Sequence, residues 1–272
     1  MPLAAVVQMT STGEVAENLD AAERLLTSAR EGGAVLAVLP ENFALMGRRE
    51  SDKLAVAEAA GSGPIQDRIA TIAQRLGLWI IAGTMPLKVE GDSRVAPASV
   101  VFDASGRQVA RYDKIHLFDV DLPDRNERYR ESATMAPGRT PVVVQTPIGK
   151  VGLAVCYDVR FPELFRQLES QGAELFSLPA AFTAPTGLAH WEVLLRARAV
   201  ENLAYMLASA QTGLHANGRE TYGDSLIADP WGRVLARRPQ GPGVVLAEID
   251  LTQQQELRAR FPALQHRVLL MG

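Results

Sequence analysis

The sequence predicts an α/β protein in which two mixed sheets pack face to face with helices outside, an α-β-β-α sandwich. Short, uninterrupted apolar runs, such as residues 3–9 and 34–39, are typical of strands that are buried on both faces. Longer segments with apolar residues at helical spacing alternate with these runs, as strand–helix–strand units require. The same order of elements occurs twice along the chain, so we expect two pseudo-repeated halves.

The first half has clear boundary signals. Gly32 and Gly33 end the first helical pattern, and Pro64 begins the second, because proline is favoured in the first turn of a helix. Residues 104–107 separate two strand-like runs and predict a hairpin turn. We expect the strands of this half at residues 3–9, 34–39, 78–82, 98–103 and 108–112, and its helices at 17–30 and 64–76.

The second half follows a polar, irregular stretch at residues 115–140. We expect a long loop there, and a loop of that length inside a compact domain usually has a function. A glycine turn at residues 147–149 then joins the first two strands of this half. We expect strands at residues 142–144, 150–155, 175–178, 205–210, 225–228, 234–236 and 244–249, and helices at 162–172, 189–202 and 252–260.

Three short echoes support a duplication, although buried strands and glycine turns resemble one another in many proteins. Each echo keeps its order in both halves, so we favour a duplicated architecture within a single domain that spans residues 1–272. The paired segments are 33–40 with 172–179, 103–111 with 229–237, and 4–8 with 152–156.

Composition argues against several classes of protein. The 28 basic and 31 acidic residues leave a net charge of −3, which provides no electrostatic footprint for nucleic acid. No apolar stretch reaches the roughly 18 residues of a membrane span, and the start of the chain reads as a strand rather than a signal peptide. A single cysteine excludes an internal disulfide and fits a reducing compartment, so we expect a cytoplasmic protein.

The single cysteine, Cys156, ends an apolar run and is followed by polar residues and a helix that starts near Pro162. A strand that turns sharply into a helix exposes its last side chain at the carboxyl edge of the sheet, where α/β proteins bind ligands. The alternative is a buried structural cysteine, which behaves as a small hydrophobe. The neighbouring residues favour a nucleophile.

Glu41 and Lys114 also follow predicted strands, so they can converge with Cys156 at one rim. The carboxylate can take the thiol proton, and the ammonium can stabilise a developing oxyanion and lower the pKa of the thiol. No motif typical of a metal site appears. The histidines are the usual bases for such thiols, but none lies in a context typical of cysteine proteases: His116, His190, His215 and His266.

Three motifs around these residues resemble those of the nitrilase superfamily of carbon–nitrogen hydrolases, at residues 39–43, 112–117 and 152–164. The resemblance covers essentially the whole chain. It implies a Glu–Lys–Cys triad at Glu41, Lys114 and Cys156. It also implies a second catalytic glutamate at Glu131, which the long loop would bring beside Lys114.

Within the superfamily the chain is most similar to the Nit branch, whose amidases act on deaminated glutathione and on related monoamides of dicarboxylic acids. The similarity lies in residues 190–201, 222–226, 229–232 and 265–267, whereas the tail at 268–272 and the loop at 180–183 depart from the pattern. An ω-amidase acting on α-keto acid monoamides, a nitrilase and a carbamoylase therefore stay open. A non-catalytic protein that uses Cys156 as a redox sensor is the alternative outside the enzymes.

We expect the enzyme to hydrolyse a small carboxylate-bearing amide to an acid and ammonia, with deaminated glutathione as the first substrate to consider. Glu41 would remove the thiol proton as Cys156 attacks, and Lys114 and a backbone N–H near Tyr157 would hold the oxyanion. A thioester on Cys156 would then be hydrolysed. A pKa of Glu41 raised by burial would suit a group that accepts and returns a proton. No cofactor is needed for these steps.

A substrate carboxylate needs a cationic anchor, and Arg160, just beyond the nucleophile, is the first choice. Asp158 or Glu163 could instead pair with it. The resemblance also suggests a homodimer or a larger homo-oligomer. Three further residues are expected to contact the substrate: Tyr157, Phe182 and Thr183. Other cations lie in loops near the expected mouth: Arg48, Arg49, Arg125, Arg128 and Arg130.

Overall fold

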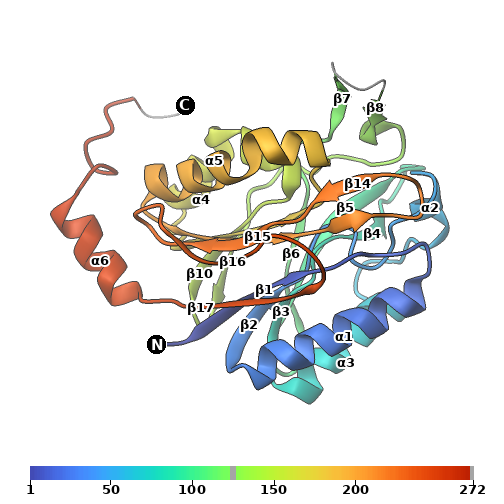
Figure 1. Ribbon diagram of the computed structural model, residues 1–272, viewed down its shortest axis with the longest axis horizontal. Coiled ribbons are helices and arrows are strands. Elements are labelled where there is room, and N and C mark those ends of the chain that lie inside the picture. Colours follow the sequence, from blue (N-terminus) through green and yellow to red (C-terminus); the bar gives the residue numbers. More distant parts are fainter. Residues whose placement is uncertain (123–126, 270–272) are drawn as a thin grey trace.

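The computed structural model describes residues 1–122 and 127–269, which form four layers (Figure 1). Two sheets lie face to face at the centre. Helices α1 (Val15–Glu31) and α3 (Pro64–Leu76) cover the outer side of one sheet, and α4 (Pro162–Ser170) and α5 (Ala184–Asn202) cover the other. The predicted α-β-β-α sandwich is confirmed.

The first sheet combines strands of the first half with one strand from the C-terminal end of the chain. Within the described residues its strands, in spatial order, are β17 (Gly243–Glu248), β1 (Leu3–Gln8), β2 (Ala34–Val38), β3 (Trp79–Ile81), β5 (Val95–Phe102) and β4 (Met85–Lys88), with β6 (Gln108–Asp113) also paired to β5. Strands β1, β2 and β3 run parallel, and β17 and β5 flank them in the antiparallel sense.

The second sheet repeats this plan. Its described strands, in spatial order, are β16 (Val234–Arg238), β15 (Ser225–Ala228), β12 (Tyr205–Ala210), β11 (Leu175–Ala180), β10 (Gly149–Leu153) and β9 (Val143–Thr146). Strands β10, β11 and β12 run parallel, as β1, β2 and β3 do, and β9 and β15 are antiparallel to their neighbours. The two predicted pseudo-repeated halves are therefore confirmed.

Strand β1 shows why the central strands are apolar throughout. Ala4 and Val6 pack in a cluster with the second sheet, whereas Ala5 and Val7 pack in a separate cluster with α1 and α3. Because alternate side chains point to opposite faces, a strand between two apolar layers needs an uninterrupted apolar run.

The turns between β5 and β6 and between β15 and β16 show the duplication in atomic detail. In each turn the aspartate Oδ1 accepts the N–H groups two and four residues further on, at 2.8 and 3.1 Å for Asp103 and at 2.9 and 2.8 Å for Asp229. Gly106 and Gly232 then adopt φ angles of +81° and +78°, which favour glycine.

The halves also exchange their last strands. The sequence predicted β9 as the first strand of the second half, but β10 is the counterpart of β1, so β9 closes the first half as β17 closes the second. Strand β9 pairs with β10 of the second half, and β17 pairs along its length with β1 of the first. Neither sheet is therefore complete without the other half. On this ground we propose that residues 1–272 form one domain.

The stretch at residues 115–140 is not the irregular loop that its polar sequence predicted. The described part forms a hairpin of β7 (Asp119–Leu122) and β8 (Glu127–Arg130), followed by a 3-10 turn, η1 (Glu131–Ala133). This hairpin projects at the top of Figure 1. In its register Asp119 lies opposite Arg130 and Asp121 opposite Arg128, and such cross-strand pairs of opposite charge stabilise a hairpin.

Several short elements were also absent from the sequence-based expectation. They are β4, α2 (Asp52–Ala55), β13 (Thr212–Leu214) and β14 (Glu220–Tyr222). Helix α5 begins at Ala184 rather than near residue 189, and α6 (Leu251–Arg260) lies at the edge of the molecule. None of the helices in the described part of the chain combines the length and apolar character needed to cross a membrane.

Candidate active site

Cys156 lies where β10 gives way to a short 3-10 helix, η2 (Cys156–Arg160), and then to α4. Its φ of +48° falls in the left-handed region, which costs a residue with a side chain roughly 1–2 kcal/mol. Cys156 is buried, yet it lines a cavity at this edge of the sheets. The sharp turn thus presents the thiol to the cavity.

Glu41 reaches the same cavity from the first sheet, three residues beyond the end of β2. Its neighbour Asn42 also has a positive φ, +56°, and the N–H of Asn42 donates to Thr84 Oγ1 at 2.8 Å. The side-chain amide of Gln211 donates to the Glu41 carbonyl at 3.0 Å. These contacts hold the backbone that carries the carboxylate.

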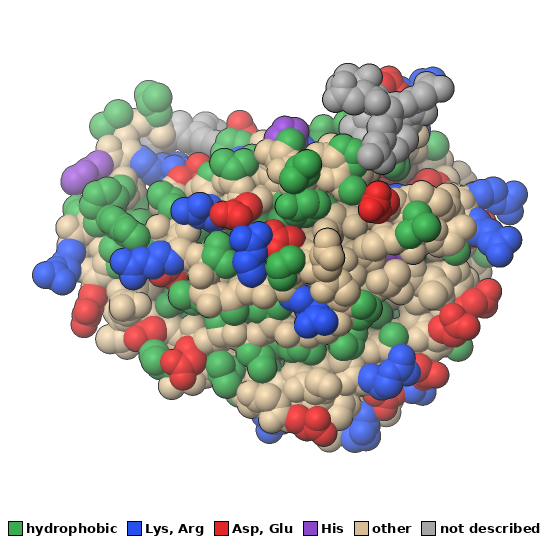
Figure 2. Space-filling model, viewed as in Figure 1, with side chains coloured by type: hydrophobic (Ala, Val, Ile, Leu, Met, Phe, Trp, Pro, Cys, Tyr) green, Lys and Arg blue, Asp and Glu red, His purple; other side chains and the backbone are tan. Residues whose placement is uncertain are grey.

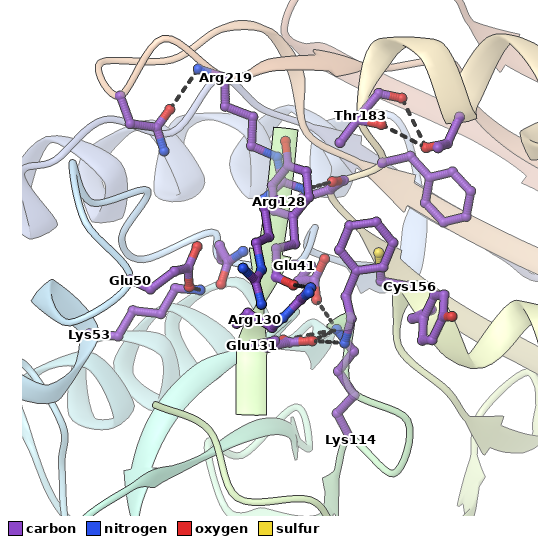
Figure 3. A pocket seen from close by; sticks show the side chains of 18 of the residues that line it. Glu41, Glu50, Lys53, Lys114, Arg128, Arg130, Glu131, Cys156, Thr183 and Arg219 are labelled. Atoms are coloured by element: carbon purple, nitrogen blue, oxygen red, sulfur yellow. Dashed lines mark hydrogen bonds and ion pairs between the residues drawn. The ribbon is translucent and has the colours of Figure 1, made fainter. Parts of the chain in front are cut away.

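Lys114 directly follows β6 and is 1 % exposed. Its Nζ donates to Glu41 Oε1 at 2.9 Å and to Glu131 Oε1 and Oε2 at 3.0 and 2.9 Å. The backbone N–H of Phe118 donates to Glu131 Oε2 at 2.6 Å. Lys114 therefore points between two carboxylates, with Cys156 beside them (Figure 3).

The surroundings determine which of these groups is charged. Burial alone would raise the pKa of Glu41, but the charge and hydrogen bond of Lys114, with a hydrogen bond from Cys156, lower that pKa below its ordinary value. Burial alone would lower the pKa of Lys114, but Glu131 and Glu41 hold it well above its ordinary value. A carboxylate and an ammonium are thus the stable forms.

The pKa of the Cys156 thiol is raised, chiefly by burial and then by the negative charge of Glu41. Lys114 and a backbone hydrogen bond from Ala181 act in the opposite direction and do not compensate. Lys114 thus lowers the pKa of the thiol, as expected, but burial and Glu41 outweigh its effect. The expectation of a raised pKa for Glu41 was wrong, because Lys114 outweighs burial at that carboxylate.

A buried carboxylate connects the Cys156 turn to the segment that carries Lys114. Asp158 Oδ2 accepts the N–H of Val155 at 2.8 Å and the hydroxyl of Tyr112 at 2.7 Å. Its Oδ1 accepts the backbone N–H of His116 at 3.0 Å and lies 2.7 Å from that ring's Nδ1. The His116 ring also stacks on Phe161, with centroids 3.7 Å apart.

The cavity has a volume of about 380 Å³ and is strongly cationic. Among the described residues that line it, seven are lysine or arginine and three are glutamate. The four residues expected to contact a substrate all line it: Tyr157, Arg160, Phe182 and Thr183.

Arg160 pairs with neither Asp158 nor Glu163. Its guanidinium lies 5.7 Å from the Tyr157 ring centroid and 5.3 Å from that of Phe182. One terminal nitrogen of Arg160 lies 3.3 Å from His190 Nδ1. No carboxylate of the described residues forms an ion pair with Arg160, so its charge is available in the cavity.

The other arginines proposed for the mouth differ in their surroundings. Arg128 and Arg130 line the cavity, but both pair with Asp121, at 3.5 and 2.8 Å. Arg48 lines it and is exposed. Arg49 instead pairs with Asp52 outside the cavity lining, and Arg125 lies outside the described residues.

Several lining residues were not expected from the sequence, among them Lys53 and Arg219. Lys53 is buried and donates to Glu50 at 2.8 Å, on the opposite side of the cavity from Cys156 in Figure 3. Arg219 lies between β13 and β14. The dipeptide Asn217-Gly218 is a strong hairpin signal and could have revealed this loop, whereas nothing in the sequence distinguishes Lys53 from an exposed lysine.

An α-β-β-α sandwich with a thiol, a buried ammonium and carboxylates in a cavity at its edge has the features of a carbon–nitrogen hydrolase. The family model described as carbon-nitrogen hydrolase matches residues 3–259. The chain belongs to this family and is an amidase.

A similar curated relative is the deaminated glutathione amidase of Synechocystis sp., which is 46% identical over 98% of both chains. The crystal structure of the Caenorhabditis elegans NitFhit protein superposes with a TM-score of 0.91 at 38% identity, covering 98% of this chain and 65% of that longer one. A structure of the Nesterenkonia sp. AN1 amidase, with acrylamide added to its active-site cysteine, superposes with a TM-score of 0.79 at 28% identity, covering 97% of this chain and 100% of the other.

Proposed function

We propose that Cys156, Glu41 and Lys114, together with Glu131, hydrolyse an amide through a covalent thioester. The observation that carries this proposal is the buried ammonium of Lys114, which bonds to both carboxylates at 2.9 Å beside a thiol that bonds to Glu41. This set contains a nucleophile, a proton acceptor and a positive charge in one cavity.

In the first step the Cys156 sulfur attacks the amide carbonyl while the thiol proton moves to Glu41. The raised pKa of the thiol requires these two events to occur together, because free thiolate is scarce. The carbonyl oxygen becomes an oxyanion held by Lys114 and by a backbone N–H near Tyr157. That oxygen competes with Glu131 for a donor of Lys114.

In the second step Glu41 returns the proton to the departing nitrogen, the C–N bond breaks, and the acyl group stays on Cys156 as a thioester. Glu41 then takes a proton from water as the water attacks the thioester carbonyl. When the C–S bond breaks, that proton passes to the sulfur and the acid leaves. Glu131 keeps Lys114 oriented and charged throughout.

We propose deaminated glutathione as the substrate, on the strength of the relative named for it. In that compound an amide joins a 2-oxo acid to cysteinylglycine, so the leaving group is an amine, whereas a primary amide releases ammonia. The compound carries two carboxylates, which suits a cavity rich in lysine and arginine. Arg160 is the proposed anchor for the carboxylate of the acyl half, with Tyr157, Phe182 and Thr183 as the walls around it.

A panel of substrates tests this proposal. Release of 2-oxoglutarate would be measured for deaminated glutathione and α-ketoglutaramate, and release of ammonia for simple amides and nitriles. We expect turnover of the carboxylate-bearing amides, and loss of at least about 10³-fold in Cys156→Ser. Turnover of nitriles alone, or full activity of Cys156→Ser, would contradict the proposal.

We also propose a homo-oligomer in the cytoplasm. Apolar side chains on the solvent side of α5 support the homo-oligomer, since Leu188, Val193 and Val200 are exposed. Figure 2 shows hydrophobic side chains on this face of the molecule. Charges of both signs are interspersed on the same face, which gives no basic patch for nucleic acid there. Light scattering on the purified protein would determine the number of subunits, and a monomeric mass would contradict the proposed homo-oligomer.

A further inference from the structure

Arg219 lies in the cavity with most of its hydrogen-bonding capacity unused. A guanidinium has five N–H donors, and one of these donates to the carbonyl of Ala181. No other acceptor for its side chain occurs among the described residues, and its Nε is buried without a partner. In the described part of the chain, no other charged side chain has a buried nitrogen or oxygen without a hydrogen-bond partner.

The Arg219 guanidinium is nevertheless held in one orientation. It lies over the Tyr129 ring, 5.2 Å from the centroid, in addition to its bond with Ala181. The backbone N–H of Arg219 donates to Asn217 Oδ1 at 2.9 Å, which holds the start of the side chain (Figure 3). A guanidinium that is already oriented loses little conformational freedom when it binds an anion.

No protein carboxylate neutralises this charge within the described residues. Glu50 is near enough for Arg219 to lower its pKa, after the larger effect of Lys53, but Glu50 forms its ion pair with Lys53. Arg128 and Arg130, in contrast, both pair with Asp121. Because an unsatisfied buried donor is unfavourable, a ligand carboxylate is the group that would complete the surroundings of Arg219.

Arg160 and Arg219 reach the cavity from different elements. Arg160 belongs to the same 3-10 turn as Cys156, the residue that retains the acyl half of the substrate, and Arg219 belongs to the loop between β13 and β14. The two guanidinium groups contact neighbouring residues of one loop, Phe182 and Ala181. Two separate cations beside one nucleophile can hold two separate carboxylates.

Building on the proposed function, we propose that Arg219 binds a carboxylate on the amine half of the substrate. The cavity then selects amides that carry one carboxylate on each side of the scissile bond: a dicarboxylic monoacyl group on one side and an amino acid or dipeptide on the other. Arg219 is thereby a specificity-determining residue. An amide whose single carboxylate lies on the acyl half does not bind Arg219.

Three substrates and two variants test this assignment. The substrates are deaminated glutathione, its analogue with an N-methyl amide in place of glycine, and α-ketoglutaramate, and each releases 2-oxoglutarate. In Arg219→Gln we expect kcat/KM for deaminated glutathione to fall about 10- to 100-fold, mainly through KM, as expected for the loss of a charge-assisted bond. The value for α-ketoglutaramate should change less than about 2-fold.

The wild type should disfavour the N-methyl amide by about the same 10- to 100-fold factor, and Arg219→Gln should not distinguish it from the parent compound. Arg49→Gln removes an equal charge from outside the cavity lining and should leave all three values unchanged. Thermal unfolding would verify that each variant is folded.

Equal losses on all three substrates would assign Arg219 a structural role through Ala181 and overturn the inference. Wild-type turnover of α-ketoglutaramate without turnover of deaminated glutathione would also overturn the inference. The proposed amide hydrolysis would still hold in that case. Absence of 2-oxoglutarate from every substrate would overturn the proposed function itself, and the inference with it.

Discussion

The same cavity moves the pKa values of Glu41 and Cys156 in opposite directions. Burial raises the pKa of both groups, but Lys114 more than offsets this for the carboxylate. The thiol instead faces the negative charge of Glu41, which adds to the effect of burial. The resting site therefore holds an ionised base beside a neutral thiol, so the sulfur becomes strongly nucleophilic only as its proton leaves.

This arrangement predicts a broad pH profile. Glu41 must be ionised to act as a base, and its pKa lies below the ordinary value of 4.5, so kcat/KM should fall only when the pH drops below that value. The pKa values of Lys114 and Cys156 are both raised. No basic decline is therefore expected up to about pH 9.

The measurement is kcat/KM between about pH 4 and 9 on a substrate with no ionisation in that range. Far-UV circular dichroism at each pH would separate loss of activity from unfolding. A decline centred near pH 7 would show that a group other than this set limits the reaction.

At the level of elements, Asp158 connects the turn that carries Cys156 to the strand end that carries Lys114. It accepts hydrogen bonds from Val155 on one side and from Tyr112 and His116 on the other, and it is fully buried. Since the two segments come from different halves of the chain, this carboxylate links the nucleophile's turn to the segment of the ammonium.

Asp158→Asn should therefore reduce both stability and turnover. An amide nitrogen cannot accept a hydrogen bond, so either the Val155 and Tyr112 donors or the His116 donors lose their acceptor. We expect unfolding to become easier by about 2–4 kcal/mol, together with a reduced kcat. Urea denaturation and steady-state kinetics would measure the two effects.

Asp20→Asn is a matched control, because Asp20 pairs with Arg68 at an exposed site. It should leave both the midpoint of unfolding and kcat unchanged, since exposed pairs contribute little. An Asp158→Asn protein indistinguishable from this control would show that the buried carboxylate does not hold the site together.

Elements with strong apolar patterns were predictable from the sequence. The ends of β12 and β15 match the expectation, because buried strands carry uninterrupted apolar runs. The hairpin of β7 and β8 has no uninterrupted apolar run, and several residues of β8 line the cavity. Short exposed elements leave little trace in the sequence, because tertiary contacts rather than apolar periodicity specify them.

The residues of the candidate site likewise differ in whether the sequence predicts them. Cys156 and Glu41 closely follow strands with uninterrupted apolar runs, and Lys114 directly follows a strand that a clear turn signal precedes, so their convergence could be expected. Lys53 lies in a four-residue helix, and Arg219 lies between two three-residue strands. Only the structure places these two residues in the cavity. The charge states also required the structure, because burial and charge act against each other on Glu41.

At the scale of the molecule, the exchange of β9 and β17 makes each sheet depend on both halves. If the first half unfolds, β17 loses its partner β1, and if the second half unfolds, β9 loses its partner β10. Packing couples the halves as well, because the buried cluster between the sheets contains side chains of both halves. Val244 and Leu246 of β17 also pack against the cluster under α1 and α3. The cavity lies between residues of both halves, so its geometry depends on the same coupling.

We therefore expect a core truncation in either half to destabilise both sheets equally. Ile69→Ala in α3 and Phe165→Ala in α4 each remove a fully buried side chain and should cost about 2–5 kcal/mol. Hydrogen exchange measured by mass spectrometry should then show equal losses of protection in β2 and β11. Leu269→Ala, at an exposed position near the C-terminal end, should leave both strands protected. Loss confined to the mutated half would instead show that the duplicated halves unfold separately, because the exchanged strands would not suffice to couple them.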